Sequence, residues 1–237
     1  MTPNAVNLQP AFILQHQRYR ETSLLLDVLT HDEGRLRLIA KGVRKSPSKT
    51  AALLQPFIPL KISYIGKTEL KTLAHVESIS PQYNLQGLAL YCGFYVNELI
   101  ERFLHPHDPH PDVFLAYQDC LAQLAENTLI QTALRLFELA LLEHTGYGLD
   151  FGQDALTQLA IVPHLRYNHQ QGIGFVADDK AAISGATLLA LASQDLSSPQ
   201  VQLEAKLLMR SVIDSHLQSK PLKSRAVILQ IINSGIY

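Results

Sequence analysis

The spacing of apolar residues changes near Pro81, and this change divides the chain into two parts. Before Pro81, short apolar runs alternate with turn-forming residues, whereas after it apolar residues recur three or four positions apart. Alternation is typical of half-buried strands, and the longer spacing is typical of helices. The pattern therefore predicts an α+β chain with a domain boundary close to Ser80–Leu85.

The first part, residues 1–80, contains strand-like segments separated by short turns. Five such segments are found, at residues 11–15, 24–30, 35–40, 58–65 and 70–77. HDEG (His31–Gly34) provides a turn before the third segment, and GKTE (Gly66–Glu69) joins the last two. Five short strands within about 80 residues are typical of a small β-barrel.

The second part, residues 81–237, is predicted to be mainly helical. Helices are expected over residues 89–104, 112–125, 130–142, 187–193 and 200–216, with a last element after KPLKSR (Lys220–Arg225). The three prolines of HPHDPHP (His105–Pro111) separate the first two helices, and GYG (Gly146–Gly148) ends the third. A weak strand pair is predicted near residues 164–177 as a small irregular or β insertion.

The charges of the chain are unevenly distributed, although its net charge is only −1. Through Glu77 there are 11 cations and 6 anions, and the remainder holds 9 cations and 15 anions. Residues 34–68 carry eight cations and no carboxylate. A basic segment joined to an acidic one favours a polyanionic partner for the first, with a solvated surface of clustered cations as the alternative.

The sharpest part of this basic segment is RLRLIAKGVRKSPSK, which follows the HDEG turn. Leu36 and Leu38 alternate with Arg35 and Arg37, so the leucines should face inward and the arginines outward on a strand. Ser46–Ser48 should keep the following residues irregular. Six cations on this strand and the loop after it could neutralise several phosphates at once, and we call them the cationic ridge: Arg35, Arg37, Lys41, Arg44, Lys45 and Lys49.

Surfaces that bind single-stranded nucleic acid usually add aromatic side chains on which bases stack. The candidates in the first part of the chain are Tyr19, Phe57 and Tyr64. Phe57 is equally well explained as a core residue.

The histidine-rich loop offers a second kind of site. His105, His107, Asp108 and His110 are suitable metal ligands, so a metal-dependent hydrolase is an alternative interpretation. The prolines fix a kinked path that does not enforce convergence of these side chains, and a polar connection between helices is the more favoured interpretation.

The two cysteines, Cys92 and Cys120, lie in helical apolar patterns and are expected to be inert core residues. No CxxC pair occurs, so a thiolate metal site and a disulfide framework are disfavoured and a reducing cytoplasm is expected. No apolar run reaches the roughly 18–20 residues that a membrane span needs.

The segment ALRLFELALLEHTGYG (Ala133–Gly148) is apolar on two sides. One stripe holds Leu134, Phe137 and Leu141, and the other holds Leu136, Leu139 and Leu142 with Arg135 beside it. Such a helix is either buried on both sides in a core or lines a groove. A groove with a cation at its rim could bind an acidic peptide that ends in an apolar residue.

The combination ETSLLLDVLTHDEGRLRLIAKGVRK and LLQPFIPL resembles the N-terminal domain of the RecO family of recombination mediators, which are bacterial DNA repair proteins. NELIERFL, DPHPDVF, RLFELALLEHTGYGLDF and KPLKSR resemble the second part of the same family. The resemblance covers essentially the whole chain in order. It implies an oligonucleotide-binding (OB-type) barrel followed by a mainly α-helical domain, with no catalytic residues and no cofactor.

The resemblance also implies a function and partners. Members of the family bind single- and double-stranded DNA, anneal complementary strands and help load the recombinase onto strands coated by single-strand binding protein. They act with RecR, and they dock on the acidic, apolar-ended C-terminal tail of the single-strand binding protein. A cytoplasmic, nucleoid-associated location without membrane contact follows. A pure protein adaptor, whose basic half binds only RecR, is a further alternative.

Carried over to this sequence, the resemblance places Arg35, Arg37, Lys41, Arg44 and Lys45 on the DNA-facing side of the barrel. The helix with Arg135 and Leu139 falls where the tail-binding groove is expected. KPLKSR, with Lys220, Lys223 and Arg225, matches a basic motif near the end of the family. Some members carry four cysteines that bind zinc after the GYGLDF segment; residues 151–177 of this chain contain none, so no zinc is predicted.

Overall fold

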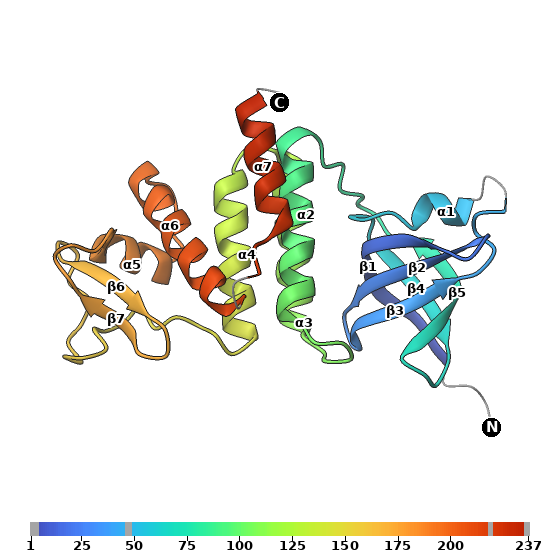
Figure 1. Ribbon diagram of the computed structural model, residues 1–237, viewed down its shortest axis with the longest axis horizontal. Helices are drawn as coiled ribbons and strands as arrows, with labels where there is room; N and C mark the ends of the chain where they lie inside the picture. The colour runs from blue at the N-terminus through green and yellow to red at the C-terminus, as the bar shows by residue number, and fades with distance from the viewer. Residues whose placement is uncertain (1–4, 46–48, 218–219, 235–237) are drawn as a thin grey trace. The chain divides into compact units, whose positions relative to one another are not determined.

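The computed structural model describes residues 5–45, 49–217 and 220–234, which form two compact units (Figure 1). The first unit contains Met1–Thr128 together with Ser224–Tyr237, and the second contains Leu129–Lys223. The chain therefore leaves the first unit, builds the second and returns to the first for its last helix. The stretch Ser46–Ser48, expected to be irregular, lies outside the described residues.

Five strands of the first unit close into a barrel (Figure 1). They are β1 (Ala5–Tyr19), β2 (Ser23–Thr30), β3 (Gly34–Ala40), β4 (Leu60–Ile65) and β5 (Leu70–Ser78). Their order is β1-β2-β3-β5-β4, with β4 pairing back onto β1 and with β3 and β5 parallel. This closed barrel, followed by helices, confirms the predicted α+β fold class and the OB-type barrel.

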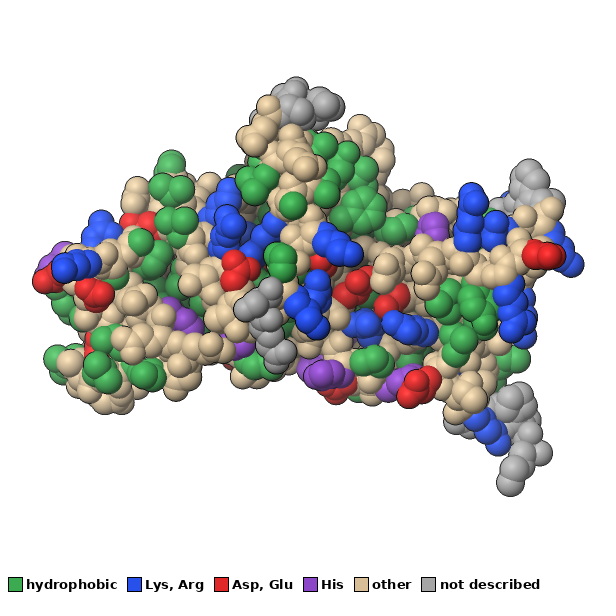
Figure 2. Space-filling view, viewed as in Figure 1, with side chains coloured by type: hydrophobic (Ala, Val, Ile, Leu, Met, Phe, Trp, Pro, Cys, Tyr) green, Lys and Arg blue, Asp and Glu red, His purple; other side chains and the backbone are tan. Residues whose placement is uncertain are grey.

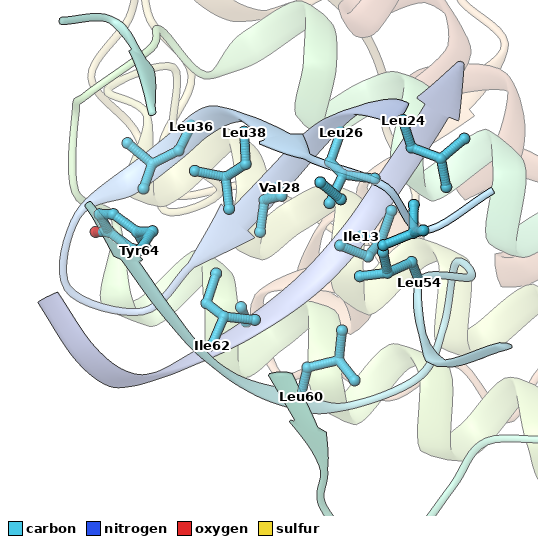
Figure 3. Packing of buried hydrophobic residues seen from close by; sticks show 13 residues of the cluster. Ile13, Leu24, Leu26, Val28, Leu36, Leu38, Leu54, Leu60, Ile62 and Tyr64 are labelled. Atoms are coloured by element: carbon cyan, nitrogen blue, oxygen red, sulfur yellow. The ribbon is translucent and has the colours of Figure 1, made fainter. Parts of the chain in front are cut away.

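The interior of the barrel is filled by alternate residues of its strands (Figure 3). Leu24, Leu26 and Val28 come from β2, Leu36 and Leu38 from β3, and Leu60, Ile62 and Tyr64 from β4. A strand sends successive side chains to opposite faces, so the alternating leucines of RLRLIA are inward as predicted. The short helix α1 (Lys49–Leu53), which the sequence pattern did not predict, lies between β3 and β4 in the chain.

Helices α2 (Gly87–Phe103), α3 (Pro111–Glu126) and α7 (Lys223–Ser234) complete the first unit. Cys92 and Cys120 are buried in α2 and α3, as expected of core residues, and neither forms a disulfide. Across the described parts of the chain, no helix combines the length and the apolar character that crossing a membrane requires.

The middle of β1 joins the barrel to these helices. The Phe12 ring lies outside the barrel interior, with its centroid 5.0 Å from that of Tyr117 and 5.4 Å from that of Phe114. Asn97 Nδ2 donates a 2.7 Å hydrogen bond to the Leu14 carbonyl, and the Tyr117 hydroxyl donates a 2.8 Å bond to Asn97 Oδ1. A buried amide is thus hydrogen-bonded on both sides, which avoids the penalty of an unsatisfied polar group.

The KPLKSR motif fastens α7 to α2, and the two helices lie side by side in Figure 1. Glu98 Oε2 accepts hydrogen bonds from the backbone N–H of Ser224, at 2.9 Å, and from its hydroxyl, at 2.6 Å. The Arg225 guanidinium lies over the Tyr95 ring, 5.6 Å from its centroid. A carboxylate at the N-terminus of a helix accepts from backbone N–H groups that lack an intrahelical partner.

The loop His105–Pro111 packs against the start of β3 by its backbone. The N–H of His107 donates a 3.0 Å hydrogen bond to the carbonyl of Arg35. His110 Nε2 lies 3.1 Å from Asp108 Oδ2, but within the described ranges no three His, Cys, Asp or Glu side chains come together to hold a metal ion. The structure shows this loop as a connection that braces β3.

The second unit combines helices with a small sheet. Its helices are α4 (Ile130–His144), α5 (Gly185–Ala192) and α6 (Pro199–His216), and its strands are β6 (Arg166–Gln170), β7 (Gly174–Ala177) and β8 (Ile183–Ser184). The pair β6–β7 occupies the segment where a strand pair was predicted, and α4 ends just before the GYG stop signal.

Two buried carboxylates order the loops of this unit. Glu204 of α6 accepts hydrogen bonds from the Ser184 backbone N–H, at 2.8 Å, and from the Thr187 hydroxyl, at 2.7 Å. Asp154 accepts from the backbone N–H groups of Thr157, at 2.8 Å, and Ala177, at 2.7 Å. These bonds tie the sheet to α5 and α6 and close the loop that precedes the sheet.

Gly34 and Gly42 provide a matched test of the contact between β3 and the histidine-rich loop. Both have positive φ, +69° and +71°, but a Cβ at Gly34 would lie 2.2 Å from the Asp108 carbonyl oxygen, whereas nothing lies within 4 Å at Gly42. We expect Gly42→Ala to cost about 1 kcal/mol of unfolding free energy and Gly34→Ala at least twice as much. Urea unfolding measures both free energies. Equal losses of stability in the two variants would show that the histidine-rich loop is not in close contact with Gly34 of β3.

Candidate nucleic-acid interface

The sequence pattern predicted that Arg35 faces solvent, but its side chain is mostly buried. Its Nε lies 3.1 Å from Asp27 Oδ1, and its Nη1 donates hydrogen bonds of 2.6 Å and 3.0 Å to the carbonyls of Glu101 and Leu104. Its side chain is 13% exposed. The last carbonyls of a helix lack intrahelical partners, so the end of α2 uses Arg35 to satisfy two of them. The expected exposure is wrong because α2 covers this end of the strand.

Arg37, two residues further along β3, is exposed. It lines a polar depression of about 60 Å³ together with Gln15, His16 and Gln17 of β1. Asp27 also lines this depression, and burial raises its pKa above the ordinary value although Arg35 and Arg37 oppose the shift. Arg37 is therefore the exposed cation of β3.

The residues after β3 are tied to the turn between β1 and β2. The backbone N–H of Arg44 donates a 2.9 Å hydrogen bond to the Thr22 carbonyl, and its guanidinium donates a 3.3 Å bond to the Arg20 carbonyl. Lys41 and Lys45 on the same turn are exposed. Figure 2 shows Lys and Arg side chains gathered at the end of the barrel that carries α1.

This attachment brings together cations from two separate segments. We call Arg18, Arg20, Lys41, Arg44 and Lys45 the barrel-end cluster. Residues 18–22 and 41–45 together contain these five cations and one carboxylate, that of Glu21. The sequence pattern did not assign Arg18 and Arg20 to the site; the signal that could have found them is the RYR triplet directly before the ETS turn.

Lys49, the last residue of the cationic ridge, is exposed at the first position of α1. The prediction that it lies on an irregular loop is wrong, because Lys49 is the first residue of the short helix α1. Of the aromatic candidates, Phe57 and Tyr64 are 5% and 1% exposed and belong to the core, whereas Tyr19 is partly exposed.

One side of α4 lines a hollow in the second unit. Leu136, Leu139 and Leu142 line a hollow of about 280 Å³, together with Ala140, Glu143, His144, Leu149, Phe151, Leu191, Ala192 and Gln194. Arg135 does not line it: the residue is 5% exposed, and its Nη2 donates a 2.6 Å hydrogen bond to Glu138 Oε1. The expectation that Arg135 forms the rim is wrong because a carboxylate one turn further along the helix holds it.

Comparison with known families adds independent information. The model "Recombination protein O N terminal" matches residues 6–82, and the model "Recombination protein O C terminal" matches residues 85–226. The chain belongs to the RecO family. It is 45% identical to "DNA repair protein RecO" of Methylococcus capsulatus over 225 residues, which cover 94% of this chain and 93% of that relative.

Other RecO relatives match to a similar extent. The chain is 42% identical to "DNA repair protein RecO" of Haemophilus influenzae over 228 residues, covering 95% of this chain and 97% of the relative. It is 39% identical to the protein of the same name from Photobacterium profundum over 225 residues, covering 94% of this chain and 95% of the relative. The resemblance noted from sequence is confirmed, and the N-terminal RecO model covers the barrel with its exposed cations.

Arg35 and Arg37 should differ sharply in their effect on stability. Removing Arg35 leaves Asp27 buried at 6% exposure without its ion pair, so Arg35→Ala should lower the unfolding free energy by about 2–3 kcal/mol. Arg37→Ala should change it by less than about 0.5 kcal/mol because the side chain is exposed. Urea unfolding tests both, and similar values for the two variants would contradict the different roles assigned to them.

Glu101 should make the stability of the first unit pH-dependent. Burial, reinforced by the charge of Asp27, raises the pKa of Glu101 to about 7, whereas Arg35 opposes the shift. Between about pH 4.5 and pH 7 the folded state therefore holds a proton that the unfolded chain has released, so the stability falls as the pH rises across this range and levels off above about 7.

Glu101→Gln should remove this dependence. The variant should be more stable than the wild type by roughly 1–2 kcal/mol at pH 8, since solvent screens part of the effect at this partly exposed carboxyl. The difference should vanish below about pH 4.5, where Glu101 is protonated in both the folded and the unfolded state. Thermal unfolding across this pH range measures it. A difference that does not change with pH would show that Glu101 is ionised in the folded protein at pH 5.

Proposed function

We propose that this RecO family protein is a non-enzymatic recombination mediator that binds single- and double-stranded DNA through its barrel. It anneals complementary strands and helps load recombinase onto strands coated by single-strand binding protein. The observation that carries the proposal is the barrel-end cluster, in which the Arg44 hydrogen bonds gather cations from two segments at one end of an OB-type barrel. Relatives named DNA repair protein RecO support the biological context.

The cations explain how such a surface would bind DNA. Arg37, Lys49 and the barrel-end cluster present positive charge that can replace the counterions around phosphates. Phosphate contacts are independent of sequence, which suits a protein that acts on any damaged region. Annealing needs two like-charged strands to approach each other, and a surface that neutralises phosphates of both strands lowers this repulsion.

Arg35 has a different role in this proposal. Because its guanidinium is engaged by Asp27 and by two α2 carbonyls, it positions β3 and leaves phosphate binding to Arg37 and the cations beyond it. The DNA-binding residues that we propose are therefore Arg37, Lys49 and the five members of the barrel-end cluster.

We also propose that the hollow on α4 receives the apolar end of the C-terminal tail of single-strand binding protein. Leu136, Leu139 and Leu142 supply an apolar lining, and His144 is the basic side chain among the lining residues. An apolar anchor in a preformed hollow is a common mode of peptide recognition. Action together with RecR, and association with the nucleoid through bound DNA, complete the proposed function.

A matched pair of triple variants tests DNA binding. Lys41→Glu/Lys45→Glu/Lys49→Glu reverses three exposed cations of the barrel, and the control Lys180→Glu/Lys206→Glu/Arg210→Glu makes the same charge change in the second unit. The barrel variant should lose at least about ten-fold in affinity for a labelled single strand at low salt.

The salt dependence adds a second measurement. Each phosphate that a protein neutralises on a single strand adds about 0.7 to the slope of log affinity against log salt. The barrel variant neutralises up to three phosphates fewer, so its slope should become shallower by about 2. Annealing of complementary oligonucleotides should slow in parallel. If both triple variants bind and anneal alike, net charge and not the barrel surface governs the interaction.

A single substitution tests the hollow. Leu139→Asp places a carboxylate among apolar lining residues, so binding of a fluorescent acidic peptide with an apolar C-terminal residue should weaken at least about ten-fold. Leu203→Asp is the control, since Leu203 is 56% exposed on α6 and does not line the hollow. DNA affinity should be unchanged in both. Retained peptide binding by Leu139→Asp would place the peptide elsewhere.

A further inference from the structure

The three aromatic candidates of the barrel differ in what the fold leaves accessible. Phe57 and Tyr64 are buried, and Tyr19, the last residue of β1, remains partly exposed. The Arg20 guanidinium carbon lies 5.4 Å from the centroid of the Tyr19 ring. Within residues 5–45, 49–217 and 220–234, no other aromatic ring or cation contacts this ring. Tyr19 is thus an aromatic side chain at the surface that is not part of a packed aromatic cluster.

The backbone around Tyr19 is held in a specific conformation. Arg20 has a φ of +52°, in the left-handed region that is unfavourable for a residue with a side chain. The two hydrogen bonds from Arg44 to the carbonyls of Arg20 and Thr22 fix this turn. Tyr19 and Arg20 are therefore presented by a turn whose shape is set by a member of the barrel-end cluster, so little ordering is needed on binding.

Tyr19 and the cations around it can recognise different parts of a nucleotide. Phosphates carry the charge that Arg18, Lys41 and Lys45 attract, whereas an aromatic ring offers a face on which a base stacks. Arg20, whose guanidinium lies over the Tyr19 ring, adds its own planar cation to the surface on which a base can stack. In a duplex the base faces are covered by neighbouring base pairs, so a ring gains a stacking partner only from a single strand.

We propose that Tyr19 and Arg20 form a base-stacking platform that makes the barrel prefer single-stranded over double-stranded DNA. The proposal rests on the proposed DNA-binding function and adds to it a residue that determines which form of DNA is favoured. The cations bind both single-stranded and double-stranded DNA through phosphates, whereas stacking on Tyr19 adds affinity only for the single strand.

Three proteins test the platform: the wild type, Tyr19→Ala, and Tyr19→Phe, which keeps the ring. Affinities are measured by fluorescence anisotropy for a labelled single strand of about 20 nucleotides, long enough for one barrel, and for a duplex of the same length. Tyr19→Ala should lose about ten-fold in affinity for the single strand, with less than about a two-fold change for the duplex. Tyr19→Phe should match the wild type on both. The salt slope should be the same in all three proteins, because every cation that binds phosphate is kept.

Two results would overturn the platform while leaving the proposed function intact. One is a Tyr19→Ala protein that binds the single strand as the wild type does. The other is an equal loss for the single strand and the duplex, which is the result expected if Tyr19 only stabilises the turn. If the wild type itself binds neither DNA at low salt, the proposed function fails and the platform fails with it.

A measurement on the unsubstituted protein covers the case in which Tyr19→Ala does not fold. A single strand that carries 5-iodouracil is irradiated in complex with the wild type, and the cross-linked peptide is identified by mass spectrometry. Cross-linking of an iodinated base favours an aromatic ring in contact with it, so the product should map to Tyr19. Cross-links confined to other residues would overturn the proposal.

Discussion

The middle of β1 is buried on both of its faces, and it joins the barrel to the helices of the first unit. Ala11 and Ile13 belong to the cluster that fills the barrel, whereas Phe12 packs against Phe114 and Tyr117 of α3, and Leu14 is also buried. The pairing register of β1 with β2 shifts between Ile13 and Gln15, so Leu14 is the irregular residue and its carbonyl is bonded by Asn97. Such a bulge redirects a strand. The exposed half of β1 that follows carries the turn to which Arg44 is bonded.

The two arginines of RLRLIA show what a sequence pattern does and does not contain. Alternation assigned Arg35 and Arg37 to the same side of β3, and they do lie on the side opposite the barrel core. The end of α2 then covers one of them and not the other, which depends on how a helix more than 60 residues away packs. Arg135 follows the same rule, because its helical spacing was predicted correctly and its burial beside Glu138 was not visible.

Helices and strands in which an apolar pattern repeats over many residues were predictable from the sequence. Contacts that depend on which strands pair with each other were not. The barrel and the helices follow from apolar residues that repeat over many positions, whereas α1 has five residues and too little length for a period to be recognised. Arg18 and Arg20 join Lys41 and Arg44 only because β2 pairs with both β1 and β3. The two apolar stripes of α4 left open whether the second stripe is buried in a core or lines a groove, and the structure shows that Leu136, Leu139 and Leu142 line a hollow.

The return of the chain to the first unit has a consequence for synthesis on the ribosome. Ser224 donates a hydrogen bond to Glu98, and Arg225 lies over the Tyr95 ring. This side of α2 can therefore be covered only after Ser224 and Arg225 have been synthesised. The second unit, Leu129–Lys223, is synthesised in the interval and can fold before the first unit receives its last helix. A nascent chain released early, or a fragment cut after α3, would leave the α7-binding side of α2 uncovered, so the first unit can be completed only after translation has passed the second unit.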